Sequence, residues 1–384
     1  MQNFVFHNPV KIIFGRGTIA SLAELVPARA RVMLLYGSGS IKGNGVYDQV
    51  MAALRHHRVE EFGGIEPNPS YETCMRAVAR ARSTAIDFLL AAGGGSVMDA
   101  TKFIAAAIPH TQGDPWDMVL KKVPVSAALP LGCVVTMPAT GSEMNLNAVI
   151  SRTETQEKIP LKSEHLYPRF SILDPDTTFS LPYRQLANGV VDTFAHVCEQ
   201  YLTYPANAPL QDRQAEAILL TLLEEAPKLH SEGDGYAVRA NLMWCATQAL
   251  NHSLSCGVPG DWSSHAIGHD LTARFGLEHA RSLAIVLPAV LSHQRHRKAE
   301  KLLQFARRVW GVTETTTDQT IDAALARTRN FFETLGLPTR LRDYQISPAD
   351  CRIIEQRLGA REPLLGEHQD LGAADVAAIL ALAE

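Results

Sequence analysis

The stretch that decides the fold is Asp87-Phe-Leu-Leu-Ala-Ala92, which runs directly into Gly93-Gly-Gly-Ser96-Val-Met-Asp99. Its nearly continuous apolar character predicts a strand buried on both faces, followed by a tight glycine turn and a helix to about Ala107. Arg31–Tyr36 followed by Gly37-Ser-Gly-Ser40 repeats this order. Two such units are typical of a parallel sheet with helices on both faces.

The rest of the first half continues the alternation of strands and helices. Further strands are predicted at Val10–Phe14, Val59–Phe62 and Gly132–Met137, and a helix at Tyr71–Arg82. Val149–Arg152 and Phe170–Leu173 are expected to pair as strands across a polar hairpin that contains Lys158. The stretch Gly113–Pro124 is expected to be a loop.

The character of the chain changes after Pro182. From there on, every predicted element is a helix with 3.6-residue periodicity, from Gln185–Tyr201 to Ala373–Ala383. The sequence therefore predicts an α/β domain over residues 1–182 and an all-helical domain over residues 183–384.

The composition of the 384 residues is that of an ordinary globular protein, with 46% hydrophobic and 20% charged residues. The net charge of −4 and the lack of a basic run give no support for binding to nucleic acid or to a membrane surface. The N-terminus lacks the features of a signal peptide, and no apolar run has transmembrane length. The six cysteines are scattered without a Cys-x-x-Cys pair, so we expect reduced thiols in a cytoplasmic protein.

Acidic and imidazole side chains recur with helical spacing between Gly189 and Ala280. Asp192 and His196 are four residues apart and lie on one face of a predicted helix. The spacing recurs at His265 and His269, and His279 follows closely. A single pair of this kind is usually an ion pair or a core histidine, but the repeated pattern favours a site for a divalent transition metal.

The two glycine turns indicate a second kind of site. Successive glycines let a ligand approach the backbone, and the N–H groups at a helix start favour a phosphate. Each turn alone could be only a tight turn, and neither matches the G-x-G-x-x-G pattern, but two together suit a dinucleotide. The cluster Thr136-x-x-x-Thr140-Gly-Ser-Glu143-x-Asn145 could line its ribose and nicotinamide end, or could simply cap a helix.

The turn after the early strand predicts the choice of dinucleotide. An acidic side chain at this place usually binds the adenosine ribose and repels a 2′-phosphate. Gly37-Ser-Gly-Ser40 contains no acidic residue, Ser38 and Ser40 can donate to a phosphate, and Lys42 is close in sequence. The turn therefore favours NADP(H) over NAD(H). The alternative is that its serines and glycines only form the turn and that both cofactors are accepted.

Several longer motifs resemble the iron-containing (group III) alcohol dehydrogenases over essentially the full chain. They are Gly63-Gly-Ile-Glu-Pro-Asn68-Pro, Gly93-Gly-Gly-Ser-Val-Met-Asp99, Pro138-Ala-Thr-Gly-Ser-Glu143, Asn188-Gly-Val-Val-Asp192-Thr-Phe-Ala-His196-x-x-Glu199 and Asp261-Trp-x-x-His265-x-x-Gly268-His269 with His279. Within the family, the chain is most similar to the NADPH-dependent aldehyde reductase and butanol dehydrogenase branch.

The resemblance implies a dehydroquinate synthase-like fold, with an N-terminal Rossmann-like α/β domain and an all-α C-terminal domain. It implies a metal-dependent NADP(H) alcohol dehydrogenase or aldehyde reductase that acts on short-to-medium-chain aldehydes, as a homodimer. The implied metal is one Fe²⁺ or Zn²⁺ ion, and its implied ligands are Asp192, His196, His265 and His279. His269 would lie near the substrate, as a catalytic residue, without binding the metal. The implied cofactor residues are Gly37, Ser38, Gly39, Ser40, Asn68, Gly94, Gly95, Ser96, Asp99, Thr136, Thr140, Asn145 and Lys158.

Three other functions compete with this interpretation. The first is a glycerol dehydrogenase-like or dehydroquinate synthase-like enzyme on the same scaffold. The ligand set and the lack of extra basic residues for a polyanionic substrate argue against it. The second is a metal-dependent hydrolase, which leaves two phosphate-type turns unexplained, and the third is a non-catalytic metal- or nucleotide-binding protein.

Overall fold

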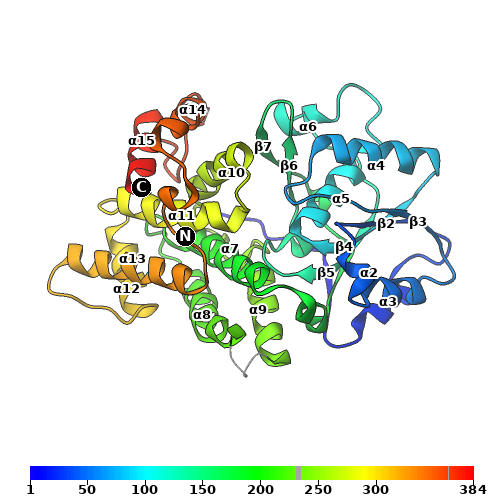
Figure 1. The fold of residues 1–384 in the computed structure, drawn as a ribbon, viewed down its shortest axis with the longest axis horizontal. Coiled ribbons are helices and arrows are strands. Elements are labelled where there is room, and N and C mark those ends of the chain that lie inside the picture. Colours follow the sequence, from blue (N-terminus) through cyan, green and yellow to red (C-terminus); the bar gives the residue numbers. More distant parts are fainter. Residues whose placement is uncertain (231–234, 362) are drawn as a thin grey trace. The chain divides into compact units, whose positions relative to one another are not determined.

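The computed structural model describes residues 1–230, 235–361 and 363–384, which form two compact units (Figure 1). The α/β unit comprises His7–Pro182 and Gly235–Thr247. The remaining described residues make up the helical unit. The predicted combination of an α/β fold with an all-helical fold is confirmed.

The α/β unit is built on a six-stranded parallel sheet with the strand order β1-β8-β5-β4-β2-β3. Its strands are β1 (Lys11–Phe14), β2 (Arg31–Tyr36), β3 (Arg58–Phe62), β4 (Phe88–Gly94), β5 (Leu131–Met137) and β8 (Phe170–Leu173). Its α-helices in the first half of the chain are α1 (Leu22–Leu25), α2 (Ser40–Gly43), α3 (Val46–Ala53), α4 (Tyr71–Ser83), α5 (Gly95–Ala107) and α6 (Trp116–Leu120), and most of α9 (Tyr236–Ala249) also belongs to it. An antiparallel pair, β6 (Asn147–Arg152) and β7 (Glu157–Lys162), completes the unit.

Alternate residues of the central strands bury themselves on opposite faces of the sheet. In β2, Met33 and Leu35 pack in the core that includes α4 and α5, whereas Val32 and Leu34 pack in the core that includes α1 and α3. Figure 1 shows α4 and α5 on one side of the strands and α2 and α3 on the other. A strand covered on both faces needs apolar residues at every position, which explains the continuous apolar runs in the sequence.

The predicted pairing of Val149–Arg152 with Phe170–Leu173 is wrong. Val149–Arg152 lies in β6, which pairs with β7, and Lys158 lies in β7 rather than in the turn between strands. Phe170–Leu173 is β8, which lies between β1 and β5 and is buried at all four positions. Such full burial is typical of an inner parallel strand and not of an exposed hairpin. The predicted loop Gly113–Pro124 also contains the short helix α6.

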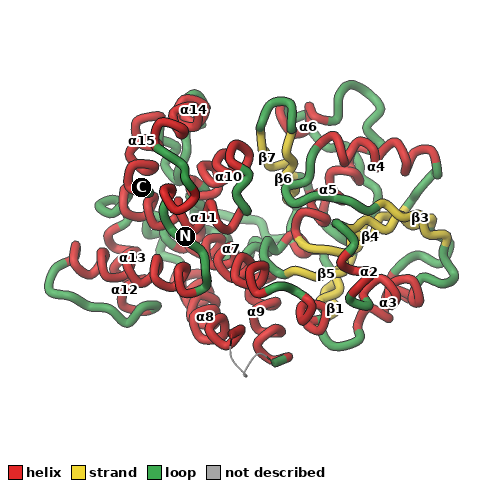
Figure 2. Tube along the Cα trace, in the orientation of Figure 1, coloured by secondary structure: helices red, strands yellow, loops and turns green. Residues whose placement is uncertain are grey.

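Helices alone form the regular structure among the described residues of the second half (red in Figure 2). They are α7 (Tyr183–Tyr201), α8 (Pro209–Glu225), α9 (Tyr236–Ala249), α10 (Ser263–Phe275), α11 (His279–His293), α12 (Ala299–Arg308), α13 (Thr317–Thr334), α14 (Pro348–Gly359) and α15 (Ala373–Leu382). Apolar residues of α10, α11, α14 and α15 share one core in the helical unit. Within the described ranges, no helix has the length and apolar character that a membrane span requires.

The glycine turn between β4 and α5 is packed tightly against other parts of the α/β unit. A Cβ atom at Gly93 would lie 2.5 Å from Cγ2 of Val97, and one at Gly94 would lie 3.0 Å from Cβ of Met137. At Gly95 it would lie 2.5 Å from both Oγ1 and Cγ2 of Thr140. Real Cβ atoms do not approach other heavy atoms as closely as at Gly93 and Gly95, so protein packing alone favours glycine at these two positions.

We therefore expect Gly95→Ala to destabilise the protein by about 1–3 kcal/mol, the usual cost of overpacking. Urea unfolding measures this loss. Adding Thr140→Ala removes the two closest atoms, so the double variant should be more stable than the sum of the single effects predicts.

Gly43→Ala is the matched control, because a Cβ atom there meets nothing within 4 Å and its φ lies outside the left-handed region. It should leave the stability nearly unchanged. Equal stabilities of the Gly95→Ala and Gly43→Ala variants would contradict the packing argument.

Candidate metal centre and dinucleotide-binding residues

Helix α7 carries polar side chains in an unusually buried position. Every residue from Leu186 to Tyr201 is buried, including Asp192, His196 and Glu199. These three lie four and seven residues apart, which places them along one face of the helix. A buried carboxylate is unfavourable unless it is paired or binds a cation, so this face requires an explanation.

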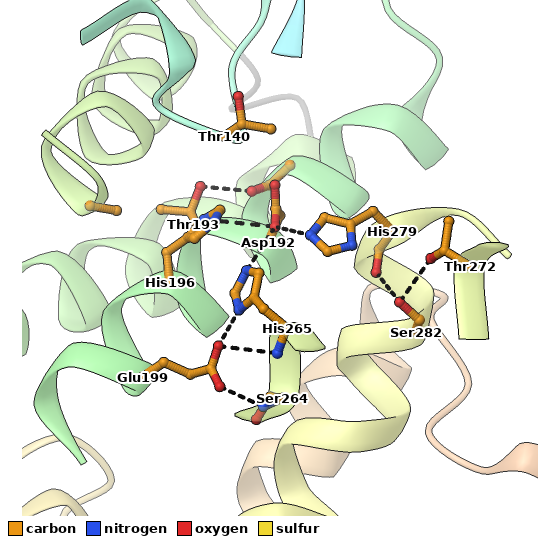
Figure 3. Close-up of polar contacts among 12 residues, drawn as sticks. Thr140, Asp192, Thr193, His196, Glu199, Ser264, His265, Thr272, His279 and Ser282 are labelled. Atoms are coloured by element: carbon orange, nitrogen blue, oxygen red, sulfur yellow. Dashed lines mark hydrogen bonds and ion pairs between the residues drawn. The ribbon is translucent and has the colours of Figure 1, made fainter. Parts of the chain in front are cut away.

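Three histidine rings converge on one carboxylate oxygen (Figure 3). Oδ1 of Asp192 lies 3.7 Å from Nδ1 of His196, 4.0 Å from Nε2 of His265 and 3.6 Å from Nε2 of His279. Ligands held at about 2.1 Å around a tetrahedral ion are about 3.4 Å apart. The spacing observed between the side chains is therefore close to that of a metal site.

The chemistry of these groups also fits a metal ion. The buried Oδ1 of Asp192 and Nδ1 of His196 have no hydrogen-bond partner. Burial lowers the pKa of His196 to about 4, so its imidazole is neutral near pH 7. A neutral imidazole is the form that binds a metal.

The candidate ligands differ in how closely they gather. Ligand atoms of Asp192, His265 and His279 all lie within 4.8 Å of one another. His196 lies beside this group, with its ring centroid 4.6 Å from that of His265. The ring of His269 lies next to the group, at centroid distances of 4.9 Å from His279 and 6.1 Å from His265. The structure thus brings all five predicted residues together.

Glu199 holds the start of α10 against α7. Its carboxylate accepts hydrogen bonds from the backbone N–H of Ser264, at 2.6 Å, and of His265, at 3.3 Å. It also contacts the ring nitrogen Nδ1 of His265. Burial raises the pKa of Glu199 to about 8, and the nearby Asp261 carboxylate adds to the shift.

Most of the residues expected to bind a dinucleotide lie at or after the carboxyl ends of the parallel strands, the edge at which α/β sheets bind ligands, whereas Lys158 lies in the antiparallel pair. Nζ of Lys158 donates to Oδ1 of Asn68 at 2.8 Å, and the backbone N–H of Asn68 donates to Oγ of Ser96 at 3.2 Å. These three predicted residues, from β7, the loop after β3 and the turn after β4, therefore form one hydrogen-bonded cluster.

A second cluster surrounds the loop after β5. Asp99 accepts hydrogen bonds from Oγ of Ser142, at 2.7 Å, and from the backbone N–H of Val149, at 2.9 Å. Nδ2 of Asn145 donates to the carbonyl of Gly141 at 2.8 Å. These hydrogen bonds connect α5 to the loop after β5 and to β6.

Lys102 lies beneath this loop and is fully buried. Its ammonium group donates to the backbone carbonyl and Oδ1 of Asn145, at 2.9 and 3.0 Å, and to the carbonyl of Asn147, at 2.8 Å. Three donors thus meet three acceptors. Burial lowers the pKa of Lys102 to about 8, against the opposing effect of the Asp99 carboxylate.

The turn Gly37–Ser40 lies beside a carboxylate from the neighbouring strand. Nζ of Lys42 pairs with Glu61 of β3 at 2.8 Å, and the hydroxyls of Tyr36 and Tyr47 donate to the same carboxylate at 3.0 and 2.6 Å. The hydrogen bonds from Lys42 and Tyr47 lower the pKa of Glu61. The positive charge of Lys42 is therefore shared with an acidic partner.

The geometry can now be compared with known proteins. Residues 9–175 match the family described as iron-containing alcohol dehydrogenase, and residues 186–383 match the C-terminal part of the same family. The chain belongs to the iron-containing alcohol dehydrogenase family. The resemblance inferred from the sequence motifs is confirmed.

Several family members are similar over nearly their whole length. The NADPH-dependent aldehyde reductase YqhD of Escherichia coli is 53% identical over 97% of both chains. A probable NADH-dependent butanol dehydrogenase of Bacillus subtilis is 43% identical over 99% of both chains. Among solved structures, E. coli YqhD gives a TM-score of 0.98 at 51% identity, covering 100% of this chain and 99% of that one. The NADH-dependent butanol dehydrogenase A of Thermotoga maritima gives 0.95 at 37% identity, with the same coverage.

Sequence reasoning missed three charged residues around the sites of this dehydrogenase. Lys102 is a single lysine within a buried apolar helix, a pattern that could have indicated a structural role. Glu61 lies in the predicted strand Val59–Phe62. Its position beside the Gly37–Ser40 turn depends on the pairing of this strand with β2, and the sequence does not reveal that pairing. Glu199 belonged to a recognised motif, but its contacts lie 65 and 66 residues further along the chain.

We expect Lys102→Met to destabilise the protein by about 2–3 kcal/mol, because three buried oxygens lose a charged donor. Urea unfolding measures the loss, and amide hydrogen exchange should accelerate between residues 141 and 149. Lys162→Met removes an exposed lysine of β7 and controls for the loss of charge. Unchanged stability and exchange in the Lys102 variant would show that its hydrogen bonds do not hold this loop.

Proposed function

We propose that this protein is a metal-dependent NADP(H) alcohol dehydrogenase that reduces short-to-medium-chain aldehydes. The observation that carries the proposal is the convergence of three imidazoles on the buried carboxylate of Asp192. Its family membership and its 53% identity to an NADPH-dependent aldehyde reductase support the same activity. A glycerol dehydrogenase-like or dehydroquinate synthase-like reaction remains the alternative on this scaffold.

The proposed metal ligands are Asp192, His196, His265 and His279. One carboxylate and three neutral imidazoles leave a divalent ion with a net charge of +1, since 2 − 1 = 1. Bound Fe²⁺ or Zn²⁺ supplies a Lewis acid that polarises the substrate carbonyl, and the residue types suit either metal. His269, whose ring lies beside that of His279, is the proposed proton donor, because imidazole is the side chain most often used as a general acid or base.

The α/β unit would bind the dinucleotide, which would supply the hydride. Backbone N–H groups at the start of α5 favour the pyrophosphate, as at other helix N-termini. The proposed cofactor residues are Gly37, Ser38, Gly39, Ser40, Asn68, Gly94, Gly95, Ser96, Asp99, Thr136, Thr140, Asn145 and Lys158. We accordingly assign cofactor binding to residues 1–182 and metal binding to residues 183–384.

The oligomeric state, the compartment and the substrate of the enzyme are also proposals. We propose a homodimer in the cytoplasm that acts on a small-molecule aldehyde or alcohol. All six cysteines are free thiols and five are buried, which fits a reducing compartment.

The first test of this function concerns the metal. With Zn²⁺ or Fe²⁺ loaded, NADPH should be oxidised in the presence of butanal, as measured by absorbance. His265→Ala and His279→Ala should lose metal content and at least ~10²-fold in kcat/KM, because each removes a ligand. His269→Ala should retain the metal and lower kcat.

The metal content of each variant, measured on the same preparations, shows whether a lower rate results from loss of the metal. Full metal content and full activity in either ligand variant would refute the assigned set. Loss of the metal in the His269 variant would place this histidine among the ligands. No NADPH oxidation by the fully loaded unmodified protein would favour one of the alternative functions.

The second test concerns the choice of cofactor. Relatives include both NADPH- and NADH-dependent enzymes, so the preference must be set by residues that vary within the family. We expect a higher kcat/KM with NADPH than with NADH. Lys42→Met should lower that ratio about tenfold, or ~1.4 kcal/mol, because the Glu61 carboxylate would then repel the 2′-phosphate.

The double variant Lys42→Met/Glu61→Gln is the matched control. It lacks both the ammonium group and the repelling carboxylate, so much of the preference for NADPH should return. An NADPH to NADH ratio at or below one in the unmodified enzyme would refute our interpretation of the Gly37–Ser40 turn.

A further inference from the structure

One acidic side chain beside the metal centre has no role in the function proposed above. Glu199 lies on α7, one turn beyond His196, and only 2% of its surface is exposed. Figure 3 shows its carboxylate below the ring of His265, on the side away from Asp192. The ring of His265 therefore lies between two carboxylates that come from the same helix.

The contacts of Glu199 determine what each ring nitrogen can do. One carboxylate oxygen accepts from the backbone N–H of Ser264, and the other accepts from that of His265 and contacts its Nδ1. Both oxygens of Glu199 accept from backbone N–H groups, which favours its ionised form. A carboxylate can only accept a hydrogen bond, so Nδ1 carries the proton where Glu199 is ionised. In a neutral imidazole, Nε2 is then the nitrogen that carries the lone pair.

That lone pair belongs to the nitrogen that faces the metal centre. Nε2 of His265 lies 4.0 Å from Oδ1 of Asp192, within the group of three candidate ligands. We propose that Glu199 is a positioning residue that fixes the Nδ1–H tautomer and the ring orientation of His265, and thereby sets the metal affinity of the site. The inference rests on the proposed metal site and not on the reaction.

Glu199 also has a purely structural contribution, which the test must separate. The N-cap residue of α10, Trp262, has a φ of 60° and makes no side-chain capping hydrogen bond. Glu199 instead binds two of the first N–H groups of this helix, where a negative charge is favourable. Loss of this cap lowers stability, whereas loss of the correct tautomer lowers metal affinity in the folded protein.

The junction around Glu199 is held from a second direction. The backbone N–H of Asp261 donates to the carbonyl of Glu199 at 2.9 Å. The Asp261 carboxylate in turn pairs with the buried ammonium group of Lys298 at 2.8 Å. The hydrogen bond to the Glu199 carbonyl therefore joins the backbone of α7 to the residues just before α10.

The decisive variant is Glu199→Gln, which keeps the shape but introduces an NH₂ group. The new NH₂ group must replace one of the two oxygens, so it faces either the backbone N–H of Ser264 or Nδ1 of His265. Facing Nδ1, it would donate and move the ring proton to Nε2, which removes that nitrogen as a ligand. We expect the dissociation constant for Zn²⁺, measured by competition with a chromophoric chelator, to rise about 10–100-fold.

Glu216→Gln provides the matched control. Glu216 is a buried glutamate of α8 in the same unit, and it accepts from the hydroxyl of Tyr201 at 2.8 Å. The substitution should lower the thermal midpoint but leave the Zn²⁺ affinity unchanged. An equal loss of affinity in the two variants would show a global effect and overturn the proposal.

A measurement on the unmodified protein makes the test independent of how the variant folds. In metal-free protein labelled with ¹⁵N-histidine, the resonances of His265, assigned by their loss in His265→Ala, should show the Nδ1–H tautomer. The Nε2–H tautomer would overturn the inference. Unmodified protein that does not bind Zn²⁺ would refute the metal site as well. Tight Zn²⁺ binding with the same affinity in Glu199→Gln would refute only the role of Glu199.

Discussion

The helical unit depends on the placement of one negative charge, the carboxylate of Asp192, inside a helix that is buried on all sides. Three imidazoles surround its Oδ1, which has no hydrogen-bond partner, and burial lowers the pKa of one of them, His196, to about 4. A buried charge left in this state is costly, and a cation is the usual solution. The same arrangement that makes this charge unfavourable on its own favours the binding of a metal ion, so part of the binding free energy would stabilise the fold.

Much of the metal centre could be predicted from the sequence, because helical spacing alone places Asp192 and His196 on one face. Spacing alone placed His269 in the ligand set beside His265, with His279 close by in the sequence. The proposal that His279 and not His269 is a ligand came from the family resemblance. The role of Glu199 could not be predicted, because its partners are on another helix. The strand pairing of Val149–Arg152 failed for a similar reason, since a short apolar run does not reveal which neighbour it has.

In the α/β unit, the sequence pointed to the glycines after β4, but the packing of the protein explains them in part. Glycines after β4 were expected to make room for a ligand, whereas Thr140 already lies against Gly95 within the protein. Lys102 was not singled out from the sequence at all. A fully buried lysine would be unfavourable without the three oxygens of Asn145 and Asn147 that accept its hydrogen bonds. Both features bind the turn after β4 to the loop after β5. The cofactor residues proposed on these two segments are therefore held in position by the same packing and hydrogen bonds.

The order of residues on α7 also limits how this family can change in length. Asp192, His196 and Glu199 act on neighbouring groups only because they share one helical face. Each residue of an α-helix turns the chain by about 100°, so a single insertion between Asp192 and Glu199 would direct one of them into the surrounding core. Insertions should therefore be confined to surface loops, while the spacing of this segment stays constant across descendants that keep the metal.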